Sequence, residues 1–157
     1  MKIELWCIGK NNFDFVETGI DTFAARIKHY TPFEIIYLED NTKINKNNHH
    51  LVKEKESQMV IKKLKGDEYL VLLDERGKQM DSLGFAGYIE HKMIYGVRKL
   101  VFVTGGAFGF SEKLYQRAKD KLSLSKMTYS HQLIRLCFVE QLYRAFTIIR
   151  NEKYHNI

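Results

Sequence analysis

Residues 69–73 read YLVLL and residues 99–103 read KLVFV, and these two runs decide the class of fold. Each is a short apolar stretch bounded by polar residues or glycine, which is typical of a strand buried on both faces of a parallel sheet. Residues 81–95 can form a helix that crosses over between them, with Asp81 as its N-cap. Strand, helix and strand in this order predict an α/β fold with a mainly parallel sheet flanked by helices.

The chain on both sides of these runs supplies further elements of the same kind. Residues 2–8 and 33–38 are expected to be strands, and four apolar residues between them recur at helical spacing, namely Val16, Ile20, Phe23 and Ile27. Other helices are predicted at residues 51–64, 112–121 (capped by Ser111) and 131–149, and a polar loop is predicted at residues 41–50. The Lys/Glu interleaving of residues 51–64 indicates either a substrate-facing arm or, more simply, a solvated helix face. The sequence shows no repeat or linker, so we expect residues 1–157 to form a single domain.

The composition narrows the class of protein. The 157 residues are 45% hydrophobic and 28% charged, which are the proportions of a globular chain. No apolar run approaches the roughly 20 residues that a membrane helix needs, and no secretory signal is recognisable. We therefore expect a cytoplasmic protein without membrane contacts, in which Cys7 and Cys137 are reduced thiols. The net charge of +6 favours a polyanionic partner, although charge alone is a weak indication.

Two glycine-containing segments follow the late strands. Residues 72–78 (LLDERGK) lack the earlier glycine of a phosphate-binding loop, and Gln79 stands where a Ser or Thr would hold magnesium, so a nucleoside triphosphatase is disfavoured. Residues 104–110 (TGGAFGF) connect a strand to a helix, but their spacing does not match the dinucleotide fingerprint. Taken alone, this segment is equally a plain turn or the lining of a site at the carboxyl end of the sheet.

The third segment is residues 122–131 (LSLSKMTYSH), whose small hydroxyl residues can hold an irregular loop. Ser130 can cap the last helix and place His131 in its first turn, where the helix dipole disfavours the imidazolium. A neutral His131 suits a base or a hydrogen-bonding role, and a surface or packing histidine is the simpler alternative. No Cys/His cluster has zinc spacing and no GxSxG elbow is present, so we expect no metal.

Together these segments resemble the ribosomal RNA large-subunit methyltransferase H family of the SPOUT superfamily, and the resemblance runs end to end. It is carried by LLDERGKQMDSLGFA at residues 72–86, FVTGGAFGFSEKLYQRA at 102–118, LSLSKMTYSHQLIRLCFVEQLYRAFTII at 122–149, and the closing Tyr154-His155. Ser130 departs from the family, which usually has proline immediately before the histidine. The resemblance implies a C-terminal trefoil knot, a homodimer and S-adenosylmethionine as methyl donor. It also implies methylation of N3 of a pseudouridine in helix 69 of 23S rRNA on the assembled ribosome.

Carried over position by position, the resemblance also implies the site residues. The methyl donor would lie against Leu73, Gly105, Gly106, Leu124, Ser125, Lys126, Met127, Thr128, Tyr129 and Ser130. Backbone groups would read the adenine edge, while Leu124 and Met127 supply apolar contact.

The acceptor side needs a different set of residues. Pseudouridine N3 carries a proton, so methylation requires a base or a group that stabilises the anion. His131 and His155 are the candidate bases, and Arg135 is expected to stabilise the anion or to hold a phosphate. The expected RNA contacts are Arg135, Arg144, Arg150, Lys153, Tyr154 and His155, with the tail reaching the active site of the other subunit.

The last helix favours a dimer independently of the resemblance. Its apolar residues cover a broad surface, namely Leu133, Leu136, Phe138, Val139, Leu142, Phe146 and Ile149. A core helix wrapped by its own chain would show the same pattern. The rival functions are a non-catalytic RNA-binding protein, another SPOUT enzyme acting on tRNA or a ribose hydroxyl, and a Rossmann-type methyltransferase, which the glycine spacing disfavours.

Overall fold

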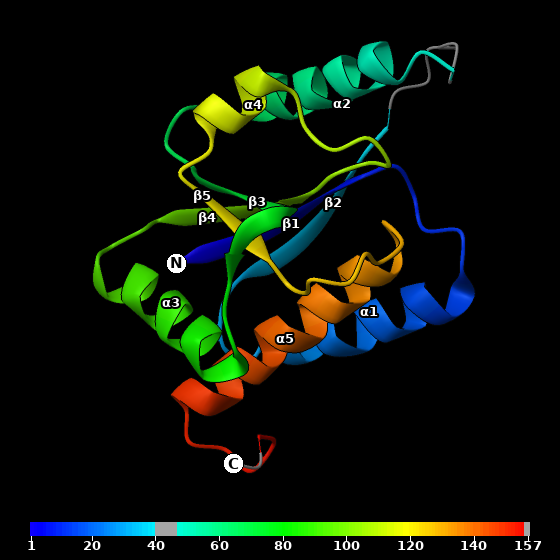
Figure 1. The fold of residues 1–157 in the computed structure, drawn as a ribbon. Helices are drawn as coiled ribbons and strands as arrows, with labels where there is room; N and C mark the ends of the chain where they lie inside the picture. The colour runs from blue at the N-terminus through cyan, green and yellow to red at the C-terminus, as the bar shows by residue number, and fades with distance from the viewer. Residues whose placement is uncertain (40–46, 156–157) are drawn as a thin grey trace.

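The computed structural model describes residues 1–39 and 47–155 as one parallel sheet between two layers of helices. Its strands are β1 (Lys2–Ile8), β2 (Phe33–Leu38), β3 (Tyr69–Gln79), β4 (Lys99–Thr104) and β5 (Asp120–Ser123), in the order β2-β1-β4-β3-β5. Its helices are α1 (Asp14–Ile27), α2 (His49–Lys63), α3 (Ser82–Ile94), α4 (Glu112–Arg117) and α5 (Leu133–Ile149). Figure 1 shows α2 and α4 on one face of the sheet and α1, α3 and α5 on the other. The predicted α/β fold with a parallel sheet is confirmed.

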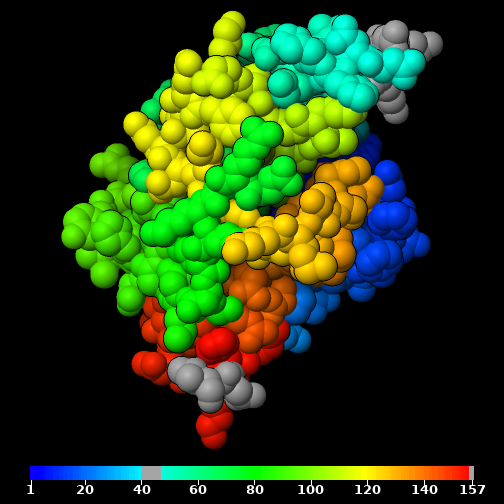
Figure 2. Space-filling view, in the orientation of Figure 1, coloured from blue at the N-terminus to red at the C-terminus, as the bar shows by residue number. Residues whose placement is uncertain are grey.

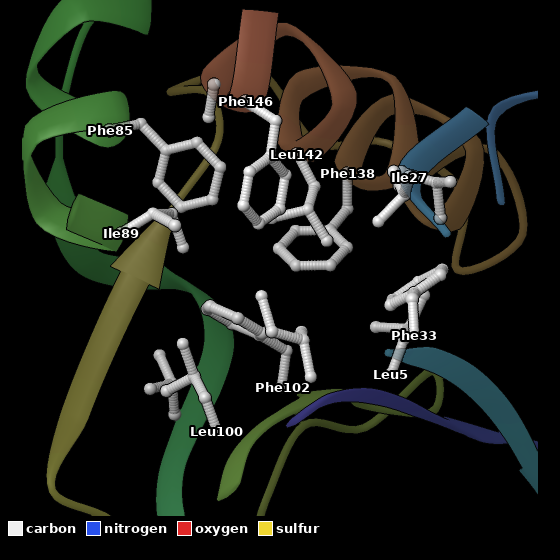
Figure 3. Packing of buried hydrophobic residues seen from close by; sticks show 14 of the residues in the cluster. Leu5, Ile27, Phe33, Phe85, Ile89, Leu100, Phe102, Phe138, Leu142 and Phe146 are labelled. Atoms are coloured by element: carbon white, nitrogen blue, oxygen red, sulfur yellow. The ribbon is translucent and has the colours of Figure 1, made fainter. Parts of the chain in front are cut away.

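Alternate side chains of the central strands pack into two separate hydrophobic cores, one on each face of the sheet. On β1, Leu5 and Cys7 face the layer of α1, α3 and α5, whereas Trp6 and Ile8 face the layer of α2 and α4. The first core is the larger and is rich in phenylalanine, including Phe102 of β4 (Figure 3). Burial on both faces is why β4 and the first half of β3 appear in the sequence as continuous apolar runs.

Helix α5 lies across the sheet with α1 and α3 on either side of it. Its Phe138, Leu142 and Phe146 are buried in the larger core, and no residue of the helix is fully exposed. Helices α1 and α5 approach closely at Gly19 of α1. The Leu136 side chain of α5 lies in the space that a Cβ at Gly19 would occupy. Most of the broad apolar surface of α5 is therefore covered by its own chain, and the homodimer stays a prediction.

The fifth strand corrects the prediction of a helix over residues 112–121. Helix α4 begins after Ser111 as expected, with the Ser111 hydroxyl accepting from the N–H of Leu114, but it ends at Arg117. The carboxylate of Asp120 then accepts hydrogen bonds from the hydroxyls of Tyr69 (2.7 Å) and Tyr88 (2.8 Å), and it pairs with Lys92 (3.2 Å). These long-range bonds favour the edge of the sheet over another turn of helix.

Three predicted boundaries also shift. Strand β3 continues to Gln79 through the charged, glycine-containing segment that was predicted to follow the strand. Helix α2 begins at His49, two residues before the predicted helix and inside the predicted loop, because the Asn48 side chain caps it by accepting from the N–H of Leu51. Positions 41–46 of that loop lie outside the described residues. Helix α5 begins at Leu133 rather than at residue 131.

The second half of β3 crosses over β5 at very short range. Lys78 and Gln79 pair with Leu122 and Ser123 after a shift in register. A Cβ added at Gly77 would lie 2.5 Å from the Leu122 carbonyl carbon, so only glycine fits at the crossing. Figure 2 shows this part of β3, in green, lying across the yellow chain around β5. The trefoil knot implied by the family resemblance stays a prediction.

Candidate functional site

A cavity of about 810 Å³ opens at the edge of the sheet where β4 and β5 end. Three segments line it: Leu73 to Arg76 in the middle of β3, residues 104–110 (the glycine loop) and residues 122–131 (the hydroxyl loop). Helix α2 and helix α4 add charged residues on one side. Open parallel sheets place their ligand sites at this edge, so the cavity is the candidate site.

The structure brings together nearly all residues that were predicted to hold a methyl donor. The cavity is lined by Leu73, Gly105, Gly106, Leu124, Ser125, Met127, Thr128, Tyr129 and Ser130, and His131 and Ile134 also line it. Lys126 is exposed and does not line the cavity. Contact with a donor remains a proposal for each of these residues.

The glycine loop is shaped by its own packing. Gly109 has a φ of +74°, which favours glycine, and its N–H donates to the carbonyl of Gly106 (3.4 Å). A Cβ at Gly106 would lie 2.8 Å from the carboxyl carbon of Glu56 on α2. One at Gly105 would lie 3.1 Å from the Phe110 ring. Neighbouring side chains therefore occupy the space next to both glycines.

Glu56 was not predicted to belong to this region. Its Oε2 is buried without a hydrogen-bond partner among the described residues, and burial raises the pKa of its carboxyl group. Sequence reasoning missed it because a glutamate within a charged helix carries no sign of what lies against it.

Serine side chains fix the hydroxyl loop as predicted. The Ser123 hydroxyl donates to the carbonyl of Ser125 (2.9 Å), and the Ser125 hydroxyl accepts from the N–H of Met127 (2.9 Å). The Ser130 hydroxyl accepts from the N–H of Leu133 (3.2 Å) and so satisfies a free donor at the start of α5. His131 lies in the turn just before that helix, at the wall of the cavity.

The pKa of His131 is lowered from its ordinary value. Partial desolvation of the imidazole is the larger cause, and the positive charge of Arg135 is the second. The direction is the one expected from the sequence, and the causes are packing and a neighbouring charge. A neutral imidazole at pH 7 is able to accept a proton.

Arg135 does not line the cavity. Its guanidinium is fully buried and donates to the carbonyl of Ile8 at the end of β1 and to Oδ1 of Asn11 (2.9 Å). Nearby, the N–H of Asn12 donates to Oε1 of Gln132 (2.7 Å). These bonds join the loop between β1 and α1 to the start of α5, next to His131. A direct contact of Arg135 with substrate stays a prediction, and in this structure its hydrogen bonds serve to position α5.

The predicted RNA-binding residues form a separate group at the far end of α5. Arg144 pairs with Glu140 and lies 4.7 Å from the centre of the Tyr154 ring, and Tyr154 donates to Glu140 (3.0 Å). His155 lies 3.3 Å from Arg144, measured from Nδ1 to the guanidinium, while Arg150 and Lys153 are exposed. At the rise of an α-helix, Arg144 is about 16 Å along the axis from the first residue of α5. Within one chain, none of these residues lines the cavity.

Two further classes of site have no support in the described parts of the chain. No group of three or more His, Cys, Asp or Glu side chains is arranged to hold a metal ion there. In the same residues, no helix is long and apolar enough to cross a membrane. Cys7 is buried and Cys137 is partly buried, and both are free thiols.

Comparisons with known proteins agree on one family. A family model described as "Predicted SPOUT methyltransferase" matches residues 1–155. A protein of Parabacteroides distasonis named ribosomal RNA large subunit methyltransferase H is 47% identical over 156 residues, and one of the same name from Christiangramia forsetii is 46% identical over 156 residues. Each of these matches covers 99% of both chains. A Cytophaga hutchinsonii protein with this name is 42% identical over 158 residues, covering 99% of this chain and 100% of the relative.

Proposed function

Since the chain belongs to the SPOUT methyltransferase family, we propose that it transfers a methyl group from S-adenosylmethionine to 23S rRNA. The acceptor is N3 of a pseudouridine in helix 69 of the assembled ribosome, as the resemblance of the sequence motifs implies. The observation that carries the proposal is the cavity at the carboxyl edge of the sheet, which is lined by the family motifs.

The cavity fits S-adenosylmethionine in size and chemistry. Cofactor sites usually occupy about 300–1,000 Å³ and combine apolar walls with a few polar groups. Here Leu73, Phe110 and Leu122 form an apolar wall suited to the adenine ring, beside the backbone of the glycine and hydroxyl loops. Lys53 and Glu54 place opposite charges on another part of the lining, as an amino acid requires. When bound, the donor supplies an electrophilic methyl group on a sulfonium.

The chain itself must then orient the acceptor and remove a proton. His131 is the proposed base for the N3 proton, because it lines the cavity and its lowered pKa keeps the imidazole neutral. Arg135 positions the turn that carries His131 through its bonds to Ile8 and Asn11. The hydroxyl loop, held by Ser123, closes one side of the cavity and limits the access of water.

The RNA contacts complete the proposal. Arg144, Arg150, Lys153, Tyr154 and His155 are basic or aromatic groups able to bind phosphate or to stack on bases. They lie outside the cavity of their own chain, which supports a homodimer in which each tail serves the partner's cavity. Because the assembled ribosome is the proposed substrate, we place the enzyme in the cytoplasm.

Mass spectrometry of 23S rRNA from cells with and without this protein tests the function directly. Loss of one methyl group from the pseudouridine in helix 69, restored by wild-type protein and not by His131→Gln, is the expected result. Methylation of tRNA or of a ribose hydroxyl would assign the chain to another SPOUT activity. A folded protein that binds no S-adenosylmethionine in calorimetry would instead be a non-catalytic RNA-binding protein.

A further inference from the structure

The lining of the cavity is divided between apolar and charged residues. The charged part is formed by residues of α2, β3 and α4, namely Lys53, Glu54, Asp74, Glu75, Arg76 and Glu112. Lys53 and Glu54 are half-buried, and within residues 1–39 and 47–155 the structure gives them neither a hydrogen bond nor an ion pair. Charged groups that lose hydration without gaining a partner are costly, so their arrangement favours a ligand that carries charge of both signs.

We propose that Lys53 and Glu54 form the subsite for the amino-acid part of the methyl donor. Lys53 would pair with its carboxylate and Glu54 with its ammonium group. The inference rests on the proposed function and adds to it the residues that distinguish S-adenosylmethionine from a plain adenosine thioether.

Helix α2 is attached at two points to the glycine loop and the residue that follows it, and these contacts fix the backbone positions of Lys53 and Glu54. At its start, the ring of His49 stacks on Phe108 with centroids 4.0 Å apart. Further along, the Ser57 hydroxyl accepts from the N–H of Ser111 (2.8 Å) in a fully buried contact. Lys53 and Glu54 lie between these two attachments and both line the cavity.

The same surface is poorly suited to the RNA backbone. Glu54, Glu75 and Glu112 all line this part of the cavity, and three carboxylates would repel phosphate groups. Asp74 adds a fourth carboxyl group, which accepts a hydrogen bond from the Tyr115 hydroxyl and so joins the middle of β3 to α4. A zwitterion satisfies both signs of charge, whereas a polyanion satisfies only Lys53 and Arg76.

Calorimetry with two probes separates this subsite from the rest of the cavity. S-adenosylmethionine carries the amino-acid moiety, and 5′-methylthioadenosine has the same nucleoside without it. In the full-length protein, Lys53→Met and Glu54→Gln should each weaken S-adenosylmethionine binding about tenfold, the effect of losing one charge-assisted contact, and leave methylthioadenosine binding unchanged. Lys62→Met makes the same change at an exposed position of α2 outside the cavity and should leave both affinities unchanged.

The outcomes distinguish this inference from the function on which it rests. Unchanged S-adenosylmethionine binding in both variants, or an equal loss for the two probes, would overturn the subsite and leave the enzyme assignment standing. If Lys53→Met weakens binding to ribosomes and leaves donor binding unchanged, Lys53 contacts RNA instead of the donor, and the proposal is rejected. Wild-type protein that binds neither probe would remove the proposed function itself.

Discussion

Replacing Gly77 with alanine should be among the most damaging single-methyl changes in this chain. The added Cβ would lie 2.5–2.7 Å from the carbonyl carbon, nitrogen and Cα of Leu122, whereas carbon atoms in contact prefer about 3.5–4.0 Å. These Leu122 atoms belong to the backbone, so a change of side-chain rotamer cannot relieve the clash. Relief requires that β3 and β5 separate by about 1 Å, which strains the pairing of Lys78 with Leu122.

The expected loss of stability follows from two costs. Overpacking in a rigid site costs about 1–3 kcal/mol, and each ladder hydrogen bond that is weakened adds about 0.5–1.5 kcal/mol. We expect Gly77→Ala to lower the free energy of unfolding by about 3 kcal/mol, measured by urea denaturation at one fixed protein concentration. Gly87→Ala is the matched control, because its Cβ meets nothing within 4 Å and alanine favours the helix, so stability should rise by about 0.5–1 kcal/mol. A Gly77→Ala protein within about 0.5 kcal/mol of wild type would refute the close crossing.

Three further predictions concern the assembly and the site. Sedimentation at micromolar concentration should give about twice the chain mass of 18.5 kDa, and a fully active monomer would reject the shared site. Tyr154 and His155 do not line the cavity, so deleting residues 154–157 should leave donor binding intact while methyl transfer to ribosomes falls strongly. Transfer at the normal rate would exclude a role for His155. The lowered pKa of His131 means that the proton-accepting form persists as pH falls through the ordinary histidine range near 6.5, and the transfer rate should decline only below it. Arg135→Met removes the neighbouring charge, the smaller of the two causes, and should move that decline to higher pH. A folded His131→Gln protein that keeps the wild-type rate and pH profile would exclude His131 as the base.

Four of the five described strands are predictable from local sequence. The short apolar runs at residues 69–73 and 99–103 are typical of strands buried on both faces, and β1 is recognised by its alternation. The edge strand β2 is also predicted, with the bounds that the structure has. Strand β5 (DKLS) is short and largely polar, and its local sequence continues a helical pattern. Its conformation is decided by Tyr69 and Tyr88, far back in the chain, which bind the Asp120 carboxylate.

In the candidate site, too, the residues that set local backbone geometry were predictable, and those placed by tertiary packing were not. Glycine and hydroxyl residues leave a mark in the sequence because they are chosen for local backbone geometry, and the loops that they form were found. The charged face of α2 has the same Lys/Glu pattern as a solvated helix, so only tertiary packing shows that Lys53 and Glu54 line the cavity while Lys62 does not. Arg135 was singled out for its chemistry, but its burial among the atoms of Ile8 and Asn11 depends on residues more than 120 positions away.

The sequence distance between Ile8 and Arg135 delays the bond between them while the chain is being synthesised. On a ribosome that adds about 5–20 residues per second, the Ile8 carbonyl is made about 6–25 s before Arg135, which follows it by 127 positions. During this interval the loop after β1, which ends at Phe13, lacks its hydrogen bonds to Gln132 and Arg135. A nascent chain stopped before Gln132 would leave that loop open to a protease, so cleavage after Phe13 would report that translation had not reached its end. The loop after β1 is synthesised early but is among the last segments to form its tertiary hydrogen bonds.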